Sequence, residues 1–352
     1  MGGIRIAHAA SRPGAAPQQS GARVDRGHSL HRHFHQQSLL HVRHRAAHLL
    51  ACGPRPAPQR HHHHPRNHSE KMKITEQVKE LIALTLREDI GNGDHSSLSC
   101  IPAEAQGDMK LLIKQDGVLA GVDVAREVLR QVDENIRMEL LLPDGTLVHK
   151  GDIAFTLHGS SRNMLTAERT LLNFMQRMSG IATTTHEYVD LVKDTNVTLL
   201  DTRKTTPNMR IFEKYAVTVG GAQNHRFGLF DMMMLKDNHI DFAGGIEKAI
   251  DAANKYLKDN NMQLNIEIET RSLDDVRRVL EHGGVQRIMF DNFTPDQIRE
   301  GVKMVDHRME TEASGGIVKE TLHDYAVTGV DFISVGAFTH QIKSSDMSLK
   351  AL

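Results

Sequence analysis

The sequence contains few cysteines and no long apolar segment. Only Cys52 and Cys100 occur among its 352 residues, and they are too few and too far apart to indicate a disulfide framework, as in proteins of a reducing compartment. No apolar run approaches the roughly 18 residues that predict a membrane-spanning helix. Together these absences favour a cytoplasmic protein.

The chain also lacks a general excess of positive charge. Its formal net charge is −1, but residues 1–71 hold eleven of the 43 Lys and Arg and two of the 44 Asp and Glu, so that segment carries +9 and the remainder −10. An acidic body repels polyanions, and binding to nucleic acid or to a membrane surface is therefore not expected. Any site for a small anion must be local.

Residues 1–71 differ in composition from the rest of the chain. They contain 13 of the 23 histidines, including His61 to His64, and no sustained apolar period from which a core could form. We expect a disordered His/Arg-rich extension. Its arginine-rich, acid-poor composition also mimics a transit peptide, although the amphipathic pattern of such a peptide is poor here.

The next part of the chain predicts helices around an antiparallel sheet. Apolar residues at helical spacing cover 74–89 and stop before the Gly-Asn-Gly at 91–93. From about 105 to 158, short strand-like runs alternate with Asp-Gly turns, interrupted by one helical pattern, "VAREVLRQV". A long helical stretch follows, and its apolar stripe predicts core packing by Leu171, Leu172, Phe174, Met175 and Met178.

After residue 196 strand-like and helical segments alternate about six times. The predicted helices include 244–259, 272–282, 295–306 and 317–327. Such alternation predicts a parallel sheet. Nearly every predicted strand ends in a polar residue, and these residues are Asp201 and Thr202, Lys236, Glu269, Asp291, Ser314 and Ser334. Ligands from many consecutive strands converge at the carboxyl end of an α/β barrel, and six units predict an incomplete, TIM-like barrel.

A cationic group lies at these strand ends. Its members are Arg203, Lys204, His225, Arg226 and Lys236. Such side chains bind carboxylate or phosphate oxygens, and arginine can do so with two parallel hydrogen bonds. The alternative for any single member is a solvated surface charge.

Acids and small residues complete the predicted rim. Glu269 and Asp291 end adjacent strands and are oxygen ligands that suit Mg²⁺ shared with substrate phosphates, though each could instead pair with the cations. "ASGG" at 313–316 and "SVGA" at 334–337 place small residues on strand-to-loop turns, where backbone N–H groups favour a phosphate. This combination suits transfer between a phosphorylated sugar diphosphate and an acid.

Several segments resemble signature segments of the quinolinate phosphoribosyltransferase family, which makes nicotinate mononucleotide for NAD synthesis. They are "AERTLLNFMQRMSGIAT", "LLDTRKTTPNMRIFEKYAVTVGGAQNHRFGLFDMMMLKDNHI", "IEIET", "MFDN", "EASGGI" and "DFISVGAFTH". The resemblance covers about 73–349, and the block at 199–240 is its most specific part. It implies transfer of phosphoribosyl from 5-phosphoribosyl 1-diphosphate to quinolinate, with release of diphosphate and CO₂.

The resemblance also implies an architecture and an assembly. It implies an α+β open-faced sandwich domain packed against an incomplete α/β barrel, in a homodimer with active sites at the subunit boundary. We therefore expect an extension at 1–71, the sandwich domain with a linking helix at 72–180, the barrel at 181–340 and a C-terminal segment at 341–352. Arg169 would enter the neighbouring subunit's site.

The same resemblance assigns roles to residues of this chain. Lys204, Lys236, Glu269 and Asp291 would be catalytic, with the two acids facing ribose and Mg²⁺-diphosphate directly or through water. The substrates would be bound by Arg169, Thr202, Arg203, Lys204, His225, Arg226, Lys236, Glu269 and Asp291, and the 5′-phosphate by Ser314, Gly315, Gly316, Ser334, Val335 and Gly336.

Three other functions are compatible with parts of this pattern. A sister phosphoribosyltransferase would act on another acid without decarboxylation. A Schiff-base aldolase would use Lys204 or Lys236 as its nucleophile. A non-catalytic phosphate-binding module would leave Glu269 and Asp291 without a role.

Overall fold

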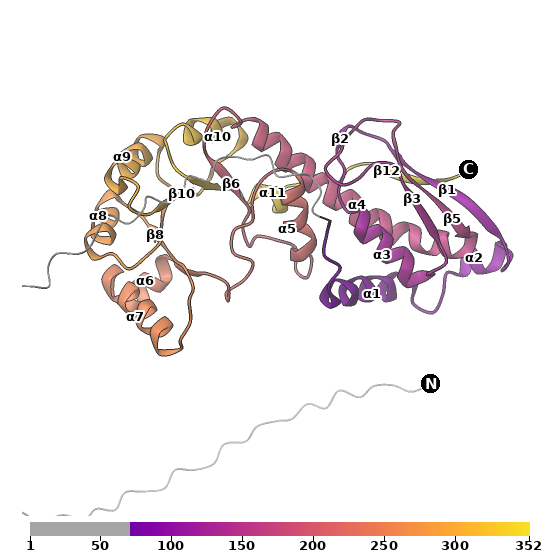
Figure 1. The fold of residues 1–352 in the computed structure, drawn as a ribbon, viewed down its shortest axis with the longest axis horizontal. Helices are drawn as coiled ribbons and strands as arrows, with labels where there is room; N and C mark the ends of the chain where they lie inside the picture. The colour runs from indigo at the N-terminus through magenta and orange to yellow at the C-terminus, as the bar shows by residue number, and fades with distance from the viewer. Residues whose placement is uncertain (1–70) are drawn as a thin grey trace, which may run out of the picture. The chain divides into compact units, whose positions relative to one another are not determined.

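The computed structural model describes residues 71–352, so the predicted extension over 1–71 lies outside the described residues except for Lys71. The described chain contains a four-stranded antiparallel sheet, a six-stranded parallel sheet and a small two-stranded sheet (Figure 1). Within this part of the chain, no helix combines the length and the apolar character that a membrane crossing requires.

The antiparallel sheet has the strand order β12-β1-β5-β3. The elements of this part are α1 (Glu76–Ile90), α2 (His95–Cys100), β1 (Gln106–Ile113), β2 (Gly117–Val118), α3 (Val122–Val132), β3 (Arg137–Leu140), β4 (Leu147–Val148), β5 (Ile153–Ser160) and the long helix α4 (Ser161–Asp190). The predicted strands between 105 and 158 are confirmed, whereas the short helix α2 was not predicted.

Helix α1 shows how local sequence sets an element's bounds. The Thr75 side chain accepts a hydrogen bond from the Val78 N–H at the start of the helix, and Gly91 ends the helix with a φ of 56°. Val78, Ile82 and Leu86 recur every four residues and are buried on one face. The helix predicted at 74–89 is therefore confirmed.

The outer strand β12 (Met347–Ala351) comes from the far end of the chain. It pairs with β1 so that Met109 lies opposite Ala351 and Ile113 opposite Met347. No element is predicted from the sequence of 341–352, because a five-residue strand has too short a pattern to stand out. The C-terminal segment therefore belongs to the sheet formed by the N-terminal part of the chain.

Helix α4 connects the antiparallel sheet to the parallel one. It packs against both α3 and α5 (Arg210–Val219). Its 30 residues correspond to roughly 45 Å. The predicted stripe is confirmed as core, since the side chains named for it are all buried.

The parallel sheet has the order β6-β11-β10-β9-β8-β7. Its elements are β6 (Thr198–Leu200), β7 (Met233–Leu235), α6 (Asp237–Ala243), α7 (Ile246–Asp259), β8 (Ile266–Thr270), α8 (Leu273–His282), β9 (Arg287–Asp291), α9 (Pro295–Val305), β10 (Glu310–Ser314), α10 (Lys319–Ala326), β11 (Phe332–Ser334) and α11 (Ala337–His340). The first and last strands in this order do not pair with each other in the described chain. The prediction of an incomplete barrel of six strands is confirmed.

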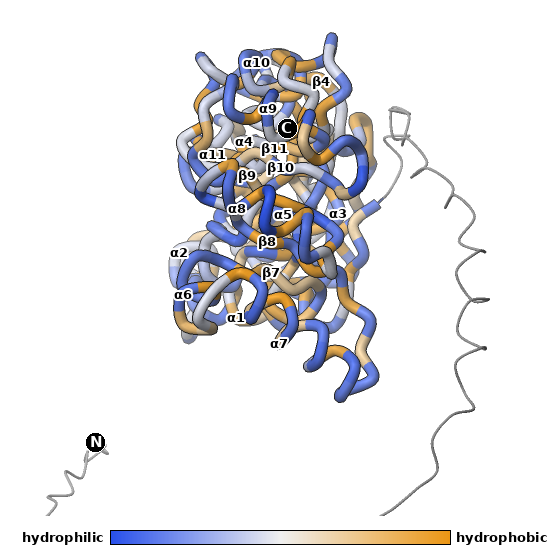
Figure 2. The backbone as a smooth tube through the Cα atoms, turned by 90° about the vertical axis from the view of Figure 1, so that its left-hand side faces the viewer, coloured by the Kyte–Doolittle hydropathy of each residue, from blue (hydrophilic) through white to orange (hydrophobic). Residues whose placement is uncertain are grey.

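The helices around this sheet are amphipathic. Helix α7 buries Ile246, Ala249, Ile250, Ala253 and Leu257, and Figure 2 shows hydrophobic and hydrophilic positions alternating along the backbone. The helix predicted at 244–259 begins at 246, because Gly244 and Gly245 have positive φ angles and separate it from the unpredicted α6.

Strand β8 explains why charged residues lie inside this barrel. All five residues of its sequence "IEIET" are buried, although two are glutamates. Side chains alternate between the two faces of a strand, so Ile266 and Ile268 share one face, while Glu267 and Glu269 share the other. The glutamates therefore project to the side on which the polar site is formed.

Candidate active site

The polar residues predicted at the strand ends lie at one edge of the parallel sheet. Ser314 at the end of β10 is paired with Asp291 at the end of β9, and Ser334 of β11 is paired with Leu200 of β6. Glu269 lies near the end of β8, beside β9. We call this edge, with the loops that follow the strands, the rim.

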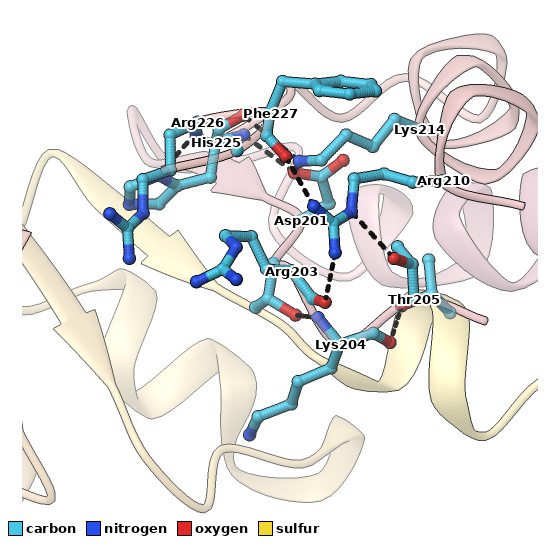
Figure 3. A network of polar contacts seen from close by, with 12 residues as sticks. Asp201, Arg203, Lys204, Thr205, Arg210, Lys214, His225, Arg226 and Phe227 are labelled. Carbon is cyan, nitrogen blue, oxygen red and sulfur yellow. Dashed lines mark hydrogen bonds and ion pairs between the residues drawn. The ribbon is translucent and has the colours of Figure 1, made fainter. Parts of the chain in front are cut away.

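Arg203 and Arg226 place two guanidinium groups close together at the rim. Figure 3 shows their side chains and that of Lys204 extending to the same side, away from α5. Burial first, and then the nearby charge of Arg203, lower the pKa of Arg226. Among residues 71–352, no carboxylate forms an ion pair with either arginine, and the buried Nε of Arg203 has no hydrogen-bond partner. An anion with more than one charge would relieve this repulsion.

Two neighbours of Arg203 have different surroundings. Lys204 is exposed, and its side chain approaches the loop after β11, because a Cβ added at Gly336 would lie 3.2 Å from the Lys204 Cδ. The Thr202 hydroxyl accepts a hydrogen bond from the Lys204 N–H at 3.1 Å. Thr202 therefore shapes the turn that presents the cations.

His225 lies below the rim instead of on it. It is 8% exposed, and its Nε2 is 3.0 Å from Glu267 and 3.2 Å from Glu312. Its Nδ1 lies 2.6 Å from the backbone nitrogen of Arg226. Burial lowers the pKa of His225, but the hydrogen bonds to the two glutamates outweigh it and raise the pKa to about 9. Nε2 therefore keeps its proton at neutral pH.

Glu267 and Glu312 were not predicted to belong to the site. Burial and the neighbouring Glu312 raise the pKa of Glu267 to about 7. Arg287 donates to Glu312 at 3.1 Å. With His225, the glutamates bring three potential metal-ligand atoms within 4.8 Å of one another. The His225 ring faces both carboxylates, and with Arg287 the group forms an internal ion-pair network.

A second group of charges joins β7, β8 and β9 at the rim. Lys236 Nζ lies 3.1 Å from Glu269 Oε1, and the Asp237 N–H donates to Glu269 Oε2 at 3.1 Å. Burial, and then the negative charge of Glu269, raise the pKa of Asp291. The two predicted metal-binding acids are therefore neighbours, and Glu269 is already partly neutralised by Lys236.

Glycines open space in the two predicted phosphate loops. Gly315 and Gly316 have φ angles of 94° and 63°, and a Cβ on Gly315 would lie 2.3 Å from the Asn292 Oδ1. At the other loop, a Cβ on Gly336 would lie 2.8 Å from the His340 Nε2. A side chain at either position would fill the space beside the strand ends.

Val335 departs from the expectation for the second loop. Its N–H donates to the Leu200 carbonyl at 2.8 Å, because the parallel ladder between β11 and β6 continues one residue beyond the assigned strand. Its side chain is 1% exposed. Neither group is therefore available to a phosphate, in contrast to what the sequence predicted.

Arg169 is not brought to this rim. It lies on the exposed face of α4, and no other described residue forms a hydrogen bond or ion pair with its side chain. Eight residues further along the same helix, Arg177 reaches Glu213 at 2.7 Å and the Thr206 hydroxyl at 2.8 Å. Eight residues correspond to roughly 12 Å of helix, which separates Arg169 from the loop that Arg177 contacts.

Two charged residues of α5 were also missed by the sequence analysis. Glu213 and Lys214 are 0% and 2% exposed. They lie between Phe212 and Ala216, which are buried on the same helix. Charges at the apolar positions of an amphipathic helix are the signal that could have revealed them.

Relatives of this chain carry names that match the chemistry of the rim. "Quinolinate phosphoribosyltransferase [decarboxylating] 2, mitochondrial" of Nicotiana glauca is 43% identical over 291 residues, covering 78% of this chain and 82% of the relative. "Nicotinate-nucleotide pyrophosphorylase [carboxylating], chloroplastic" of Arabidopsis thaliana is 42% identical over 291 residues, covering 78% of this chain and 83% of the relative.

The mitochondrial and chloroplastic names of these relatives contradict the cytoplasmic prediction. The cytoplasmic prediction was wrong because a low cysteine count and the lack of a membrane span are equally compatible with the interior of an organelle.

The comparisons also identify the two parts of the fold. The family models "Quinolinate phosphoribosyl transferase, N-terminal domain" and "C-terminal domain" match residues 94–179 and 181–350. The structure of the nicotinate-nucleotide pyrophosphorylase from Francisella tularensis superimposes with a TM-score of 0.75 and 38% identity, covering 80% of this chain and 98% of that one. The chain therefore belongs to the quinolinate phosphoribosyltransferase family.

Proposed function

We propose that the rim of the barrel transfers phosphoribosyl from 5-phosphoribosyl 1-diphosphate to quinolinate, forming nicotinate mononucleotide, diphosphate and CO₂. The observation that carries the proposal is the adjacent pair Arg203 and Arg226, which has no carboxylate counter-ion among the described residues. Quinolinate has two carboxylates on neighbouring ring atoms. A dianion of this size suits two guanidinium groups that repel each other until an anion arrives.

The cations divide between the two substrates in this proposal. Arg203 and Arg226 bind the quinolinate carboxylates, and His225, which immediately precedes Arg226, is held below the rim by its contacts with Glu267 and Glu312. Lys204, whose stem lies beside Gly336, binds oxygens of either substrate. The 5′-phosphate lies at Ser314, Gly315 and Gly316 and beside Ser334 and Gly336, where glycines leave the backbone accessible.

The acids suit a magnesium ion shared with substrate oxygens. Glu269 is close enough to Asp291 to raise the pKa of Asp291, after burial, and a divalent cation nearby would relieve this repulsion. Since Lys236 and Asp237 already bind Glu269, we propose binding through water or diphosphate oxygens. When bound, Mg²⁺ neutralises the diphosphate leaving group.

The chemistry follows from these contacts. The unprotonated ring nitrogen of quinolinate uses its lone pair to form a bond to the anomeric carbon, while the C–O bond to diphosphate breaks. The electron pair of the broken C–O bond leaves with the diphosphate. Glu269 and Asp291 stabilise the positive charge that develops on the sugar, while Lys236 keeps Glu269 oriented. In the adduct, the C–CO₂ bond breaks and CO₂ departs, leaving the electron pair on the ring carbon, where the adjacent positive nitrogen stabilises it until a solvent proton binds to that carbon.

We also propose a homodimer in which Arg169 completes the neighbouring site. The proposal is supported by its exposed position, its lack of a partner among the described residues, and its separation along α4 from the part of the helix that contacts the 201–206 loop. A further arginine would add to the cations that face the quinolinate carboxylates.

The test is incubation of the full chain with quinolinate, phosphoribosyl diphosphate and Mg²⁺, followed by chromatography for nicotinate mononucleotide. Product that requires all three components supports the proposal. No product would contradict it. Product without CO₂ would favour a sister phosphoribosyltransferase, and borohydride trapping of a carbonyl substrate on Lys204 or Lys236 would favour an aldolase.

A further inference from the structure

Helix α5 carries two cations, Arg210 and Lys214, that lie one helical turn apart. Each contacts both loops that supply the arginines of the rim. The first loop, residues 201–206, contains Arg203, and the second loop, residues 224–231, contains Arg226. Figure 3 shows α5 approaching these loops from the side opposite to the Arg203 and Arg226 guanidinium groups.

Lys214 joins the bases of the two loops. Its Nζ lies 2.5 Å from Asp201 Oδ1 in the first loop and 3.2 Å from the His225 carbonyl in the second. The same Asp201 oxygen accepts the His225 N–H at 2.8 Å. Asp201 is two residues before Arg203, and His225 immediately precedes Arg226. The contacts therefore fix the backbone next to both arginines.

Arg210 joins the outer parts of the same loops. It donates to the Thr205 hydroxyl at 3.0 Å and to the Arg203 carbonyl at 3.4 Å, both in the first loop. A third hydrogen bond, of 3.0 Å, goes to the Phe227 carbonyl in the second loop. Each of the three guanidinium nitrogens makes one of these contacts, and the single nitrogen of a lysine could not occupy all three positions.

The cost of burying Lys214 indicates that the contact has a purpose other than stability. Burial lowers the pKa of Lys214 and raises the pKa of Asp201 to about 6. A buried ion pair often contributes no more to folding than apolar residues of the same volume would. Its geometry, however, is specific, because the lysine must meet one carboxylate and one carbonyl at the same time.

We propose that Lys214 and Arg210 are positioning residues that hold the Arg203 and Arg226 guanidinium groups at the spacing required by the two carboxylates of quinolinate. This inference rests on the proposed function and deepens it. Neither residue contacts the substrate. Loss of the contacts should weaken quinolinate binding more than phosphoribosyl diphosphate binding, since the phosphate loops at 314–316 and 334–336 belong to other strands.

Two variants separate positioning from folding. Asp201→Asn with Lys214→Met removes both buried charges together, so that neither is left unpaired. Arg210→Lys keeps a positive charge at a partly exposed position but cannot make all three contacts. Lys258→Met on α7 is the matched control, because Lys258 is exposed and far in sequence from both loops.

The measurement is KM and kcat for each substrate in the full chain, together with the melting temperature. We expect the two test variants to raise KM for quinolinate by about tenfold or more, with a much smaller effect on KM for phosphoribosyl diphosphate. Arg210→Lys should keep the melting temperature of the control. If the double variant does not fold, Arg210→Lys decides the question by itself.

Three outcomes would overturn the inference in distinguishable ways. An unmodified chain that forms no nicotinate mononucleotide would contradict the proposed function and this inference with it. An active unmodified chain, with test variants whose KM values for both substrates match Lys258→Met, would contradict the positioning role alone. An equal rise of both KM values would also contradict it, because it would indicate general disruption of the rim.

Discussion

Lys236 Nζ lies 3.1 Å from Glu269 Oε1, and this ion pair joins the carboxyl ends of the neighbouring strands β7 and β8. Lys236 is the single residue between β7 and α6, so it links a strand to a helix and also contacts an acid of the rim. The pair is partly exposed, with Lys236 at 46% and Glu269 at 10% side-chain exposure. Its contribution should therefore appear in activity more than in stability.

Lys236→Ala is expected to reduce kcat/KM for nicotinate mononucleotide formation by roughly tenfold to a hundredfold. The reason is that a hydrogen bond to a charged group contributes about 1.5–3 kcal/mol when the site is closed to water. Steady-state kinetics of this variant beside Lys258→Ala, an exposed lysine of α7, measures the difference. Equal activities of the Lys236→Ala and Lys258→Ala variants would show that Lys236 takes no part in the reaction.

Mixed dimers test whether Arg169 acts in the neighbouring subunit. Arg169→Ala and Lys236→Ala homodimers should each be nearly inactive, whereas a mixed dimer has one doubly altered site and one intact site. Random reassortment makes about half of the dimers mixed, so roughly a quarter of all sites should recover. The two variants are unfolded and refolded together, and product formation is assayed. Lack of recovery, with subunit exchange verified by mass-tagged chains, would place Arg169 outside the neighbour's site.

Gly315→Ala is expected to raise KM for phosphoribosyl diphosphate. The new Cβ would meet the Asn292 side-chain oxygen at 2.3 Å, beside the proposed phosphate position. A φ of 94° also disfavours alanine by about 1 kcal/mol or more. Gly151→Ala is the matched control, because Gly151 has a φ of 103° and nothing within 4 Å of an added Cβ. If both variants lose stability alike and neither changes KM, the phosphate assignment of this loop is wrong.

The contacts of His225 predict how the stability of the folded chain depends on pH. Its pKa is about 9 in the folded chain against an ordinary value of 6.5, because the two glutamates outweigh burial. The folded state therefore holds the proton more tightly. The contribution to the free energy of unfolding, roughly 3 kcal/mol at most, is fully present below pH 6.5 and is lost as the pH rises through about 9.

The measurement is the melting temperature between pH 6 and pH 9.5 for the unmodified chain and for His225→Gln. Glutamine can still donate to a glutamate but does not titrate. The unmodified chain should lose stability more steeply over this interval. Parallel curves would show that His225 does not titrate as its contacts imply.

The strand-end residues could be predicted because their position follows from chain order. In a parallel sheet every carboxyl end lies at one edge, so Lys236, Glu269 and Asp291 had to come together once the strands were recognised. Each of these three residues lies at the last position of its strand or one residue from it. The six-strand organisation followed from periodicity in the same way.

Other parts of the site depend on side-chain direction, which sequence pattern does not specify. His225 was expected to line the substrate site, yet both of its ring nitrogens have partners below the rim. Lys214 and Arg210 act through contacts with backbone carbonyls, and carbonyls are present at every residue. Only the folded geometry shows which carbonyls they reach. The pairing of β12 with β1 is missed for a related reason, since it joins segments more than 200 residues apart.

The most direct test of the central claim uses quinolinate labelled with carbon-14 in the carboxyl group next to the ring nitrogen. The full chain is incubated with this substrate, phosphoribosyl diphosphate and Mg²⁺. Diphosphate, nicotinate mononucleotide and CO₂, of which only CO₂ carries the label, are measured over time. We predict that all three form in equal amounts and that no labelled CO₂ appears when phosphoribosyl diphosphate is omitted. Diphosphate release without labelled CO₂, or CO₂ release without the sugar donor, would contradict the proposed coupling of transfer and decarboxylation.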